Sequence, residues 1–208
     1  IFGPGRESNH PMQEAVNHLK SADPVLAALI ERVGPPRIQY REPTFEILVR
    51  SIAFQQLNGK AASTIYNRLV EAAGGKITPA SILRLRPPKM RACGLSRQKL
   101  SYIRDLAQQT RKGKVDFARL PQMPDHEVIA HLTRVKGIGE WSAHMFLLFA
   151  LRRPDVLPTG DFGVCNAIRR LYKKRTMPTP RQVERIAQSW HPHCSLATWY
   201  LWRSADGD

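Results

Sequence analysis

The sequence predicts an all-α fold, and three observations support that prediction. Apolar residues recur at helical spacing along most of the chain, so one face of each predicted helix can be buried. No segment alternates apolar and polar residues for long enough to predict a β-strand. Most of the 16 prolines fall between the predicted helices, where proline begins a helix or follows its end.

The helices predicted before residue 75 follow from this spacing and from their end signals. The first two lie at about 13–21 and 24–32. The third, at about 44–57, has apolar residues at i, i+3, i+4 and i+7 from Phe45 and begins after a proline and a threonine. The fourth follows Asn58-Gly59 and ends at the glycine pair 74–75.

The later helices follow from the same signals. A short helix is predicted at 79–85, and a longer one at 96–112 carries an apolar stripe from Leu100 to Ala107. The others are predicted at 125–134, 140–152, 162–173, 180–190 and 195–204. Because the connections are short and no repeat or flexible linker separates the helices, we expect one compact body that can consist of two lobes.

The chain is strongly basic. Its 208 residues include 32 Lys and Arg against 17 Asp and Glu, which gives a formal charge of +15. Since 42% of the residues are hydrophobic, the chain can bury a core, and an extended disordered tail is excluded. Between 84 and 114 there are ten cations and a single acid, Asp105. This charge favours nucleic acid over a membrane as partner, with a solvated basic face as the alternative for that segment.

Other features narrow the class of protein. No apolar run approaches the ~18 residues of a membrane span, so no membrane partner is expected. The three cysteines are too scattered for a disulfide framework, which predicts a reducing, intracellular compartment. Residues 1–11 lack a signal-peptide pattern and are expected to be an expression scar ahead of the fold in 12–208.

The most informative segment is a predicted hairpin of two helices. One helix should end near Val135, and an apolar helix should begin at Glu140. Gly137 and Gly139 permit positive φ and leave the backbone uncovered, so the amides and dipole of the second helix can meet a phosphate. Ile138 between them is expected to anchor the turn to the core. An ordinary glycine-capped helix connection is the alternative.

Two stretches resemble those of a known family. The hairpin reads Val-Lys-Gly-Ile-Gly-Glu-Trp over 135–141, and a later loop reads Leu-Pro-Thr-Gly-Asp-Phe-Gly-Val over 157–164. With the segments at 54–57 and 190–197, they resemble the helix-hairpin-helix (HhH-GPD) DNA glycosylase superfamily over about residues 40–205. The spacing from Trp141 to Asp161 is that of its alkylpurine branch, which includes bacterial and yeast 3-methyladenine glycosylases.

The resemblance implies a two-lobed fold with the active-site cleft between the lobes. The central lobe would span about 40–152, and the second would combine 12–39 with 159–208. The implied activity is that of a monofunctional DNA glycosylase of base excision repair, which flips alkylated purines such as 3-methyladenine and 7-methylguanine from double-stranded DNA and leaves an abasic site. We expect a monomer, in the cytoplasm and nucleoid of a bacterium or the nucleus of a eukaryote.

The resemblance also implies a catalytic carboxylate, Asp161. A fixed negative charge stabilises the positive charge that develops on the sugar as the base departs, and it can orient the attacking water. The alternative role, a helix N-cap, is compatible with this one. Bifunctional relatives use a lysine at the position of Trp141, so water is the expected nucleophile. Only Cys165 and Cys194 follow Asp161, so no iron–sulfur cluster is expected.

Other DNA-contacting residues follow from the same resemblance. Leu57 matches the family's intercalating wedge, with a core leucine in the last helical turn as the alternative. Gln56 and Asn58 would contact bases in the minor groove. The predicted base pocket consists of Trp141, Phe162, Trp202 and Met145. Burial in the core is the alternative role for the aromatic residues. Met145 stands where a relative has tyrosine.

Phosphate and metal contacts complete the expected site. The predicted phosphate contacts are Lys136, Gly137, Gly139, Ser96, Arg97 and Lys99. The main-chain carbonyls of Thr133, Val135 and Ile138 would hold a structural Na⁺ or K⁺. Zinc is not expected at His191, His193 and Cys194, because ligands crowded into four residues give poor tetrahedral geometry, so this segment is interpreted as a turn before the last helix. No cofactor is required.

Two other functions fit parts of the sequence. A non-catalytic module could use the hairpin to hold the DNA backbone, but it would leave Asp161, Trp141 and Leu57 without a joint purpose. A glycosylase/lyase with another lesion specificity is the second alternative.

Overall fold

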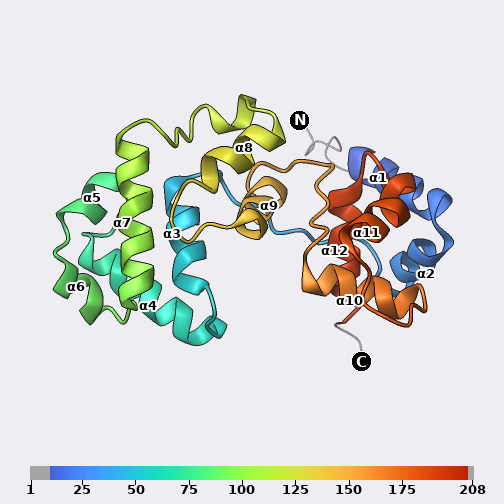
Figure 1. Cartoon of the computed structure of the whole chain (residues 1–208), viewed down its shortest axis with the longest axis horizontal. Helices are drawn as coiled ribbons and strands as arrows, with labels where there is room; N and C mark the ends of the chain where they lie inside the picture. Colours follow the sequence, from blue (N-terminus) through green and yellow to red (C-terminus); the bar gives the residue numbers. More distant parts are fainter. Residues whose placement is uncertain (1–9, 206–208) are drawn as a thin grey trace, which may run out of the picture. The chain divides into compact units, whose positions relative to one another are not determined.

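The computed structural model describes residues 10–205, and this part of the chain is all-helical, as predicted. Figure 1 shows short helices joined by short connections. In chain order the helices are α1 (His10–Ala22), α2 (Pro24–Val33), α3 (Phe45–Phe54), α4 (Gly59–Ala72), α5 (Pro79–Arg84), α6 (Pro87–Ala92), α7 (Arg97–Arg111), η1 (Leu120–Gln122), α8 (Asp125–Leu132), α9 (Glu140–Phe149), α10 (Phe162–Leu171), α11 (Pro180–Ala187), η2 (Gln188–Trp190) and α12 (Cys194–Arg203).

Some boundaries differ from the prediction. α6 was not predicted; it begins at Pro87-Pro88, and proline suits the first turn of a helix. α3 ends at Phe54, three residues early, because Gln55 leaves the helical conformation with a ψ of 131° and Gln56 follows with a φ of 56°. α1 begins at His10, so the end of the expected expression scar belongs to a helix. The rest of that segment, 1–9, lies outside the described residues.

The chain divides into two compact units. Residues 40–151 form one, the central unit, and the described residues on either side of it, 10–39 and 152–205, form the other, the terminal unit. α3 to α9 belong to the central unit, in which α7 packs on α3 and α5. Its buried core includes Leu48, Ile52, Ile103 and Leu106.

The terminal unit is built around helices from both ends of the chain. α12 packs against α2 and α10. The largest fully buried side chains of this unit are Trp190 and Tyr200. The buried carboxylate of Asp23 caps α2 and also accepts hydrogen bonds from Tyr172 Oη at 2.6 Å and Trp190 Nε1 at 2.9 Å. Asp23 therefore ties α2 to segments 149 and 167 residues later.

Among the residues described, no helix is both long enough and apolar enough to cross a bilayer.

Candidate active site

Asp161 is held at the start of α10. It is the N-cap of this helix and is 7% exposed. Its Oδ1 accepts the backbone N–H of Val164 at 2.8 Å and the indole N–H of Trp202 at 2.9 Å. The expected capping role is therefore present. The two donors reach the carboxylate from α10 and α12, so they fix its orientation.

Gly163 allows Trp202 to approach this closely. A Cβ at position 163 would lie 2.9 Å from Trp202 Cδ1 and 3.1 Å from Asp161 Oδ1. Gly163 belongs to the Asp-Phe-Gly-Val segment, but the sequence does not reveal its contact with Trp202. Nearby, burial and then the charge of Asp161 raise the pKa of the Cys165 thiol, so Cys165 is a protonated neighbour of the carboxylate.

Two of the three predicted pocket aromatics are exposed, where a core role would bury them. Phe162, next to Asp161, is 74% exposed, and Trp141 at the start of α9 is 52% exposed. The core alternative is wrong for these two residues. Trp202 and Met145 are half-buried. Phe162 and Trp202 belong to the terminal unit, whereas Trp141 and Met145 belong to the central unit, so a shared pocket stays a prediction.

The hairpin turn connects α8 to α9. Gly137 has a φ of 79°, and a Cβ there would fall 2.0 Å from Cδ2 of Tyr102. Glycine is therefore required at 137 by both backbone and packing. Gly139 has an ordinary φ of −90° and open space around it. Ile138 is 4% exposed, which confirms that it anchors the turn to the core.

Two side chains outside the hairpin hold its backbone. The Lys136 N–H donates to Asp105 Oδ2 of α7 at 2.9 Å, and Gln55 Nε2 donates to the Gly137 carbonyl at 2.9 Å. Sequence reasoning did not assign either contact. A single acid within a basic segment was the available signal for Asp105. The start of α9 at Gly139 is exposed and has no side-chain cap, which suits an anion at this helix N-terminus.

The predicted wedge lies on an exposed turn between α3 and α4. Leu57 is 41% exposed and follows the positive φ of Gln56, so the core-leucine alternative is wrong. Asn58 Oδ1 caps α4 by accepting the Ala61 N–H at 2.9 Å. Gln56 and Asn58 are both exposed beside Leu57.

The predicted phosphate contacts at the start of α7 have unequal roles. Ser96 is the N-cap of α7, and Arg97 is exposed. Lys99 Nζ donates to the carbonyl of Ala53 at 2.9 Å, near the C-terminal end of α3, and burial lowers its pKa. Lys99 therefore has a structural partner in the protein, which the sequence did not reveal.

The proposed cation ligands lie within the turn. Carbonyl oxygens are suitable ligands for a hard cation, so the donor chemistry of Thr133, Val135 and Ile138 fits. The Val135 carbonyl also accepts the Ile138 N–H at 3.1 Å, which closes the turn. The cation itself stays a prediction.

Comparison with known proteins finds one family model that covers both the hairpin and Asp161. The model of the HhH-GPD superfamily of base excision DNA repair proteins matches residues 49–193. The chain belongs to the HhH-GPD superfamily. It is 33% identical over 200 residues to DNA-3-methyladenine glycosylase 1 of Schizosaccharomyces pombe, covering 93% of this chain and 88% of the relative. It is 28% identical to the putative DNA-3-methyladenine glycosylase YfjP of Bacillus subtilis, covering 95% and 70%.

Two solved structures have a similar fold. The S. pombe 3-methyladenine DNA glycosylase Mag1 in complex with abasic DNA matches with a TM-score of 0.80 and 34% identity, covering 93% of this chain and 97% of that one. The DNA-3-methyladenine glycosidase of Bacillus halodurans matches with a TM-score of 0.84 and 34% identity, covering 93% and 89%. The HhH-GPD match spans both the hairpin and Asp161, whereas Trp202 lies beyond it.

Proposed function

We propose that this protein is a monofunctional DNA glycosylase that removes alkylated purines, such as 3-methyladenine and 7-methylguanine, from double-stranded DNA in base excision repair. The observation that carries the proposal is the carboxylate of Asp161, fixed by α10 and Trp202 in a chain that also has the superfamily's hairpin. The names of the S. pombe and B. subtilis relatives support the alkylpurine substrate.

Asp161 supplies charge where the reaction develops it. As the bond from C1′ to the base nitrogen breaks, its electron pair leaves with the base, and the sugar becomes positively charged. A carboxylate whose orientation is already set stabilises that charge without reorganisation. Water then bonds to C1′ and loses a proton, which Asp161 can accept, and an abasic site remains.

Trp141 decides between hydrolysis and lyase chemistry. Bifunctional relatives have a lysine at this position, whose amine attacks the sugar. An indole nitrogen is not a nucleophilic amine, so Trp141 cannot form that covalent intermediate. Lys136 lies in the turn before the glycines and is assigned to a phosphate instead.

Aromatic side chains would select the damaged base. Alkylation at N3 or N7 gives a purine a positive charge, and stacking on an electron-rich ring contributes about 0.5 to 2 kcal/mol through cation–π attraction. We assign this role to Trp141, Phe162 and Trp202, with Met145 lining the pocket. Leu57 would fill the space of the flipped base, flanked by Gln56 and Asn58.

The hairpin and the start of α7 would hold the DNA backbone. We assign phosphate contacts to Lys136, the glycines of the turn, Ser96, Arg97 and Lys99. We also propose that the protein acts as a monomer on chromosomal DNA, in the nucleoid of a bacterium or the nucleus of a eukaryote.

Release of methylated bases from N-methylated duplex DNA tests the proposal. The wild-type protein should release 3-methyladenine and 7-methylguanine, and Asp161→Asn should lower the rate by about 100-fold or more with DNA affinity retained. Asparagine is the matched variant because its side-chain oxygen can still cap α10 and accept the Trp202 N–H. Asp161→Ala additionally removes the cap, at a cost of about 1 kcal/mol in stability.

Three outcomes would contradict the proposal. Normal DNA binding without base release by the wild-type protein would favour a non-catalytic binding module. Turnover of Asp161→Asn near the wild-type rate would remove this carboxylate from the mechanism. Borohydride trapping of a covalent protein–DNA adduct would indicate a glycosylase/lyase.

A further inference from the structure

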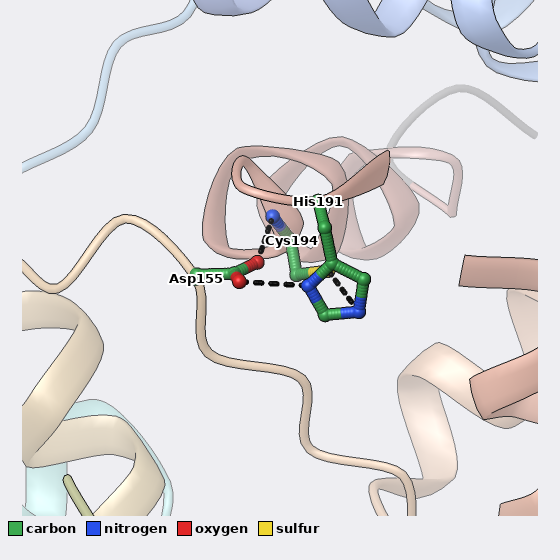
Figure 2. A group of neighbouring side chains, drawn as sticks. All are labelled: Asp155, His191 and Cys194. Atoms are coloured by element: carbon green, nitrogen blue, oxygen red, sulfur yellow. Dashed lines mark hydrogen bonds and ion pairs between the residues drawn. The ribbon is translucent and has the colours of Figure 1, made fainter. Parts of the chain in front are cut away.

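Three side chains of types that bind metals meet in the terminal unit. Asp155 lies in the connection before α10, His191 lies at the turn before α12, and Cys194 is the first residue of α12. Figure 2 shows the three side chains pointing toward one another, and one potential ligand atom from each lies within 4.8 Å of the others. Asp155 Oδ2 is 2.7 Å from His191 Nδ1, and Cys194 Sγ is 3.5 Å from the same nitrogen.

The structure brings together a different set of possible ligands from the one that the sequence suggests. Zinc was not expected from the sequence because His191, His193 and Cys194 would all have to bind one ion. His193 instead packs its ring against His18, with ring centroids 5.1 Å apart. The third donor is Asp155, which lies 36 residues before His191 and approaches from a separate segment.

One distance in the cluster suits a small tetrahedral ion. With Zn–S of about 2.3 Å and Zn–N of about 2.0 to 2.1 Å, a tetrahedron places sulfur and nitrogen about 3.5 Å apart. This is the distance observed between Cys194 Sγ and His191 Nδ1, 3.5 Å. The Asp155–His191 pair would have to open from its hydrogen-bonding distance. The His191 side chain is 51% exposed, so it has room to turn and leaves water access to a fourth position.

The cluster places a buried thiol beside a carboxylate, so an ion bound there would have to displace the proton of the thiol. Cys194 is fully buried, and burial together with the hydrogen bond to Asp155 raises the pKa of its thiol well above the usual range. Burial opposes ionisation of Asp155, but hydrogen bonds from His191 and Cys194 lower its pKa overall. A divalent cation would offset the cost of placing a thiolate beside this carboxylate.

A nucleophilic Cys–His–Asp arrangement fits these observations less well. Such an arrangement needs the thiol aligned with one ring nitrogen. Cys194 Sγ lies 3.5 Å from Nδ1 and 3.8 Å from Nε2 of His191, so it is aligned with neither. His191 Nδ1, the ring nitrogen nearer to the sulfur, is already hydrogen-bonded to Asp155.

We propose that Asp155, His191 and Cys194 bind one Zn²⁺ ion, with water as the fourth ligand. On binding, the Cys194 thiol releases its proton to solvent. His191 Nδ1, which donates to Asp155 without the ion, also gives up its proton, so that the bound imidazole is neutral with its proton on Nε2. The role of the ion is structural: it fastens the connection that leads to Asp161 onto the start of α12, the helix that carries Trp202. Ser195 already bonds this connection, donating its N–H to the Pro154 carbonyl at 3.0 Å.

Zinc titration of the whole chain, freed of metal with a chelator, tests this site. The wild-type protein should bind one equivalent of Zn²⁺ in competition with a chromophoric chelator, with a raised Tm. Cys194→Ser and His191→Gln should each weaken binding by more than the roughly 10- to 100-fold that loss of an outer-shell partner costs. Cys165→Ser and His193→Gln are matched controls outside the cluster and should bind like wild type.

Cobalt provides a second readout that identifies the sulfur ligand. Co²⁺ in the wild-type site should give a thiolate-to-metal charge-transfer band, and Cys194→Ser should lack it. His191→Gln alters an exposed side chain, so the test does not depend on folding of the buried Cys194→Ser variant. Absence of stoichiometric Zn²⁺ binding by the wild-type protein would overturn the proposal, as would unchanged binding in both variants.

Discussion

Asp161 has the capping role that the sequence predicts, and its catalytic role stays a prediction. The same oxygen that caps α10 accepts the Trp202 indole, so the carboxylate is part of the scaffold and is held in one orientation. The capping role follows from the sequence, because aspartate before a helical pattern is a common N-cap. The contact with Trp202, 41 residues later, does not, because sequence spacing carries no information about tertiary distance.

Gly137 and Gly139 are predicted to respond differently to the same substitution. Gly137→Ala should cost about 1 to 2 kcal/mol from the left-handed backbone alone, with a further cost from contact with Tyr102. Gly139→Ala is the matched control and should cost less than about 1 kcal/mol, because its φ is ordinary and its surroundings are open. Denaturant unfolding measures both variants. Equal losses would contradict the packing described for Gly137.

Leu57→Ala is predicted to affect base flipping and leave stability unchanged. Because Leu57 is exposed on a turn, the free energy of unfolding should change by less than about 0.5 kcal/mol. Excision should fall more for a lesion in a stable base pair than for the same lesion in a mismatch, since a mismatched base is easier to flip. Single-turnover rates on the two duplexes give the comparison, and equal reductions would argue against a wedge.

At the scale of helices, the sequence predicted most elements and few of the contacts between them. Apolar periodicity placed α3, α4 and α7, because each buries one face against the others. It missed α6, which has one fully buried side chain, Met90, and so no repeated apolar pattern. The anchoring of the hairpin by Asp105 and Gln55 was also missed, since both act across long sequence separations.

The role of Asp105 can be separated from its charge. Asp105→Ala removes the acceptor of the Lys136 N–H and should weaken DNA affinity by about tenfold. Loss of an acid alone would act in the opposite direction, because it makes the protein more positive. Glu71 is exposed on α4, so Glu71→Ala is the matched control and should slightly strengthen DNA binding. Fluorescence anisotropy with one duplex measures both, and tighter binding by Asp105→Ala would contradict the anchoring role.

For the whole molecule, the net charge of +15 predicts salt-sensitive DNA binding. The logarithm of the affinity should fall linearly with the logarithm of salt concentration, by about 0.9 for each phosphate contact. Arg97→Ala should reduce this slope by about 1. Arg111→Ala, at the other end of α7, makes the same charge change and should leave the slope unaltered. An unchanged slope for Arg97→Ala would assign that residue to a solvated face.

The terminal unit has a consequence for biosynthesis. Its core joins α1 and α2 to α10 and α12, and Asp23 finds its partners Tyr172 and Trp190 only near the other end of the chain. The central unit, in contrast, is one continuous segment. During translation α1 and α2 can therefore pack on each other but remain without α10 and α12, while the segment that follows them can already fold.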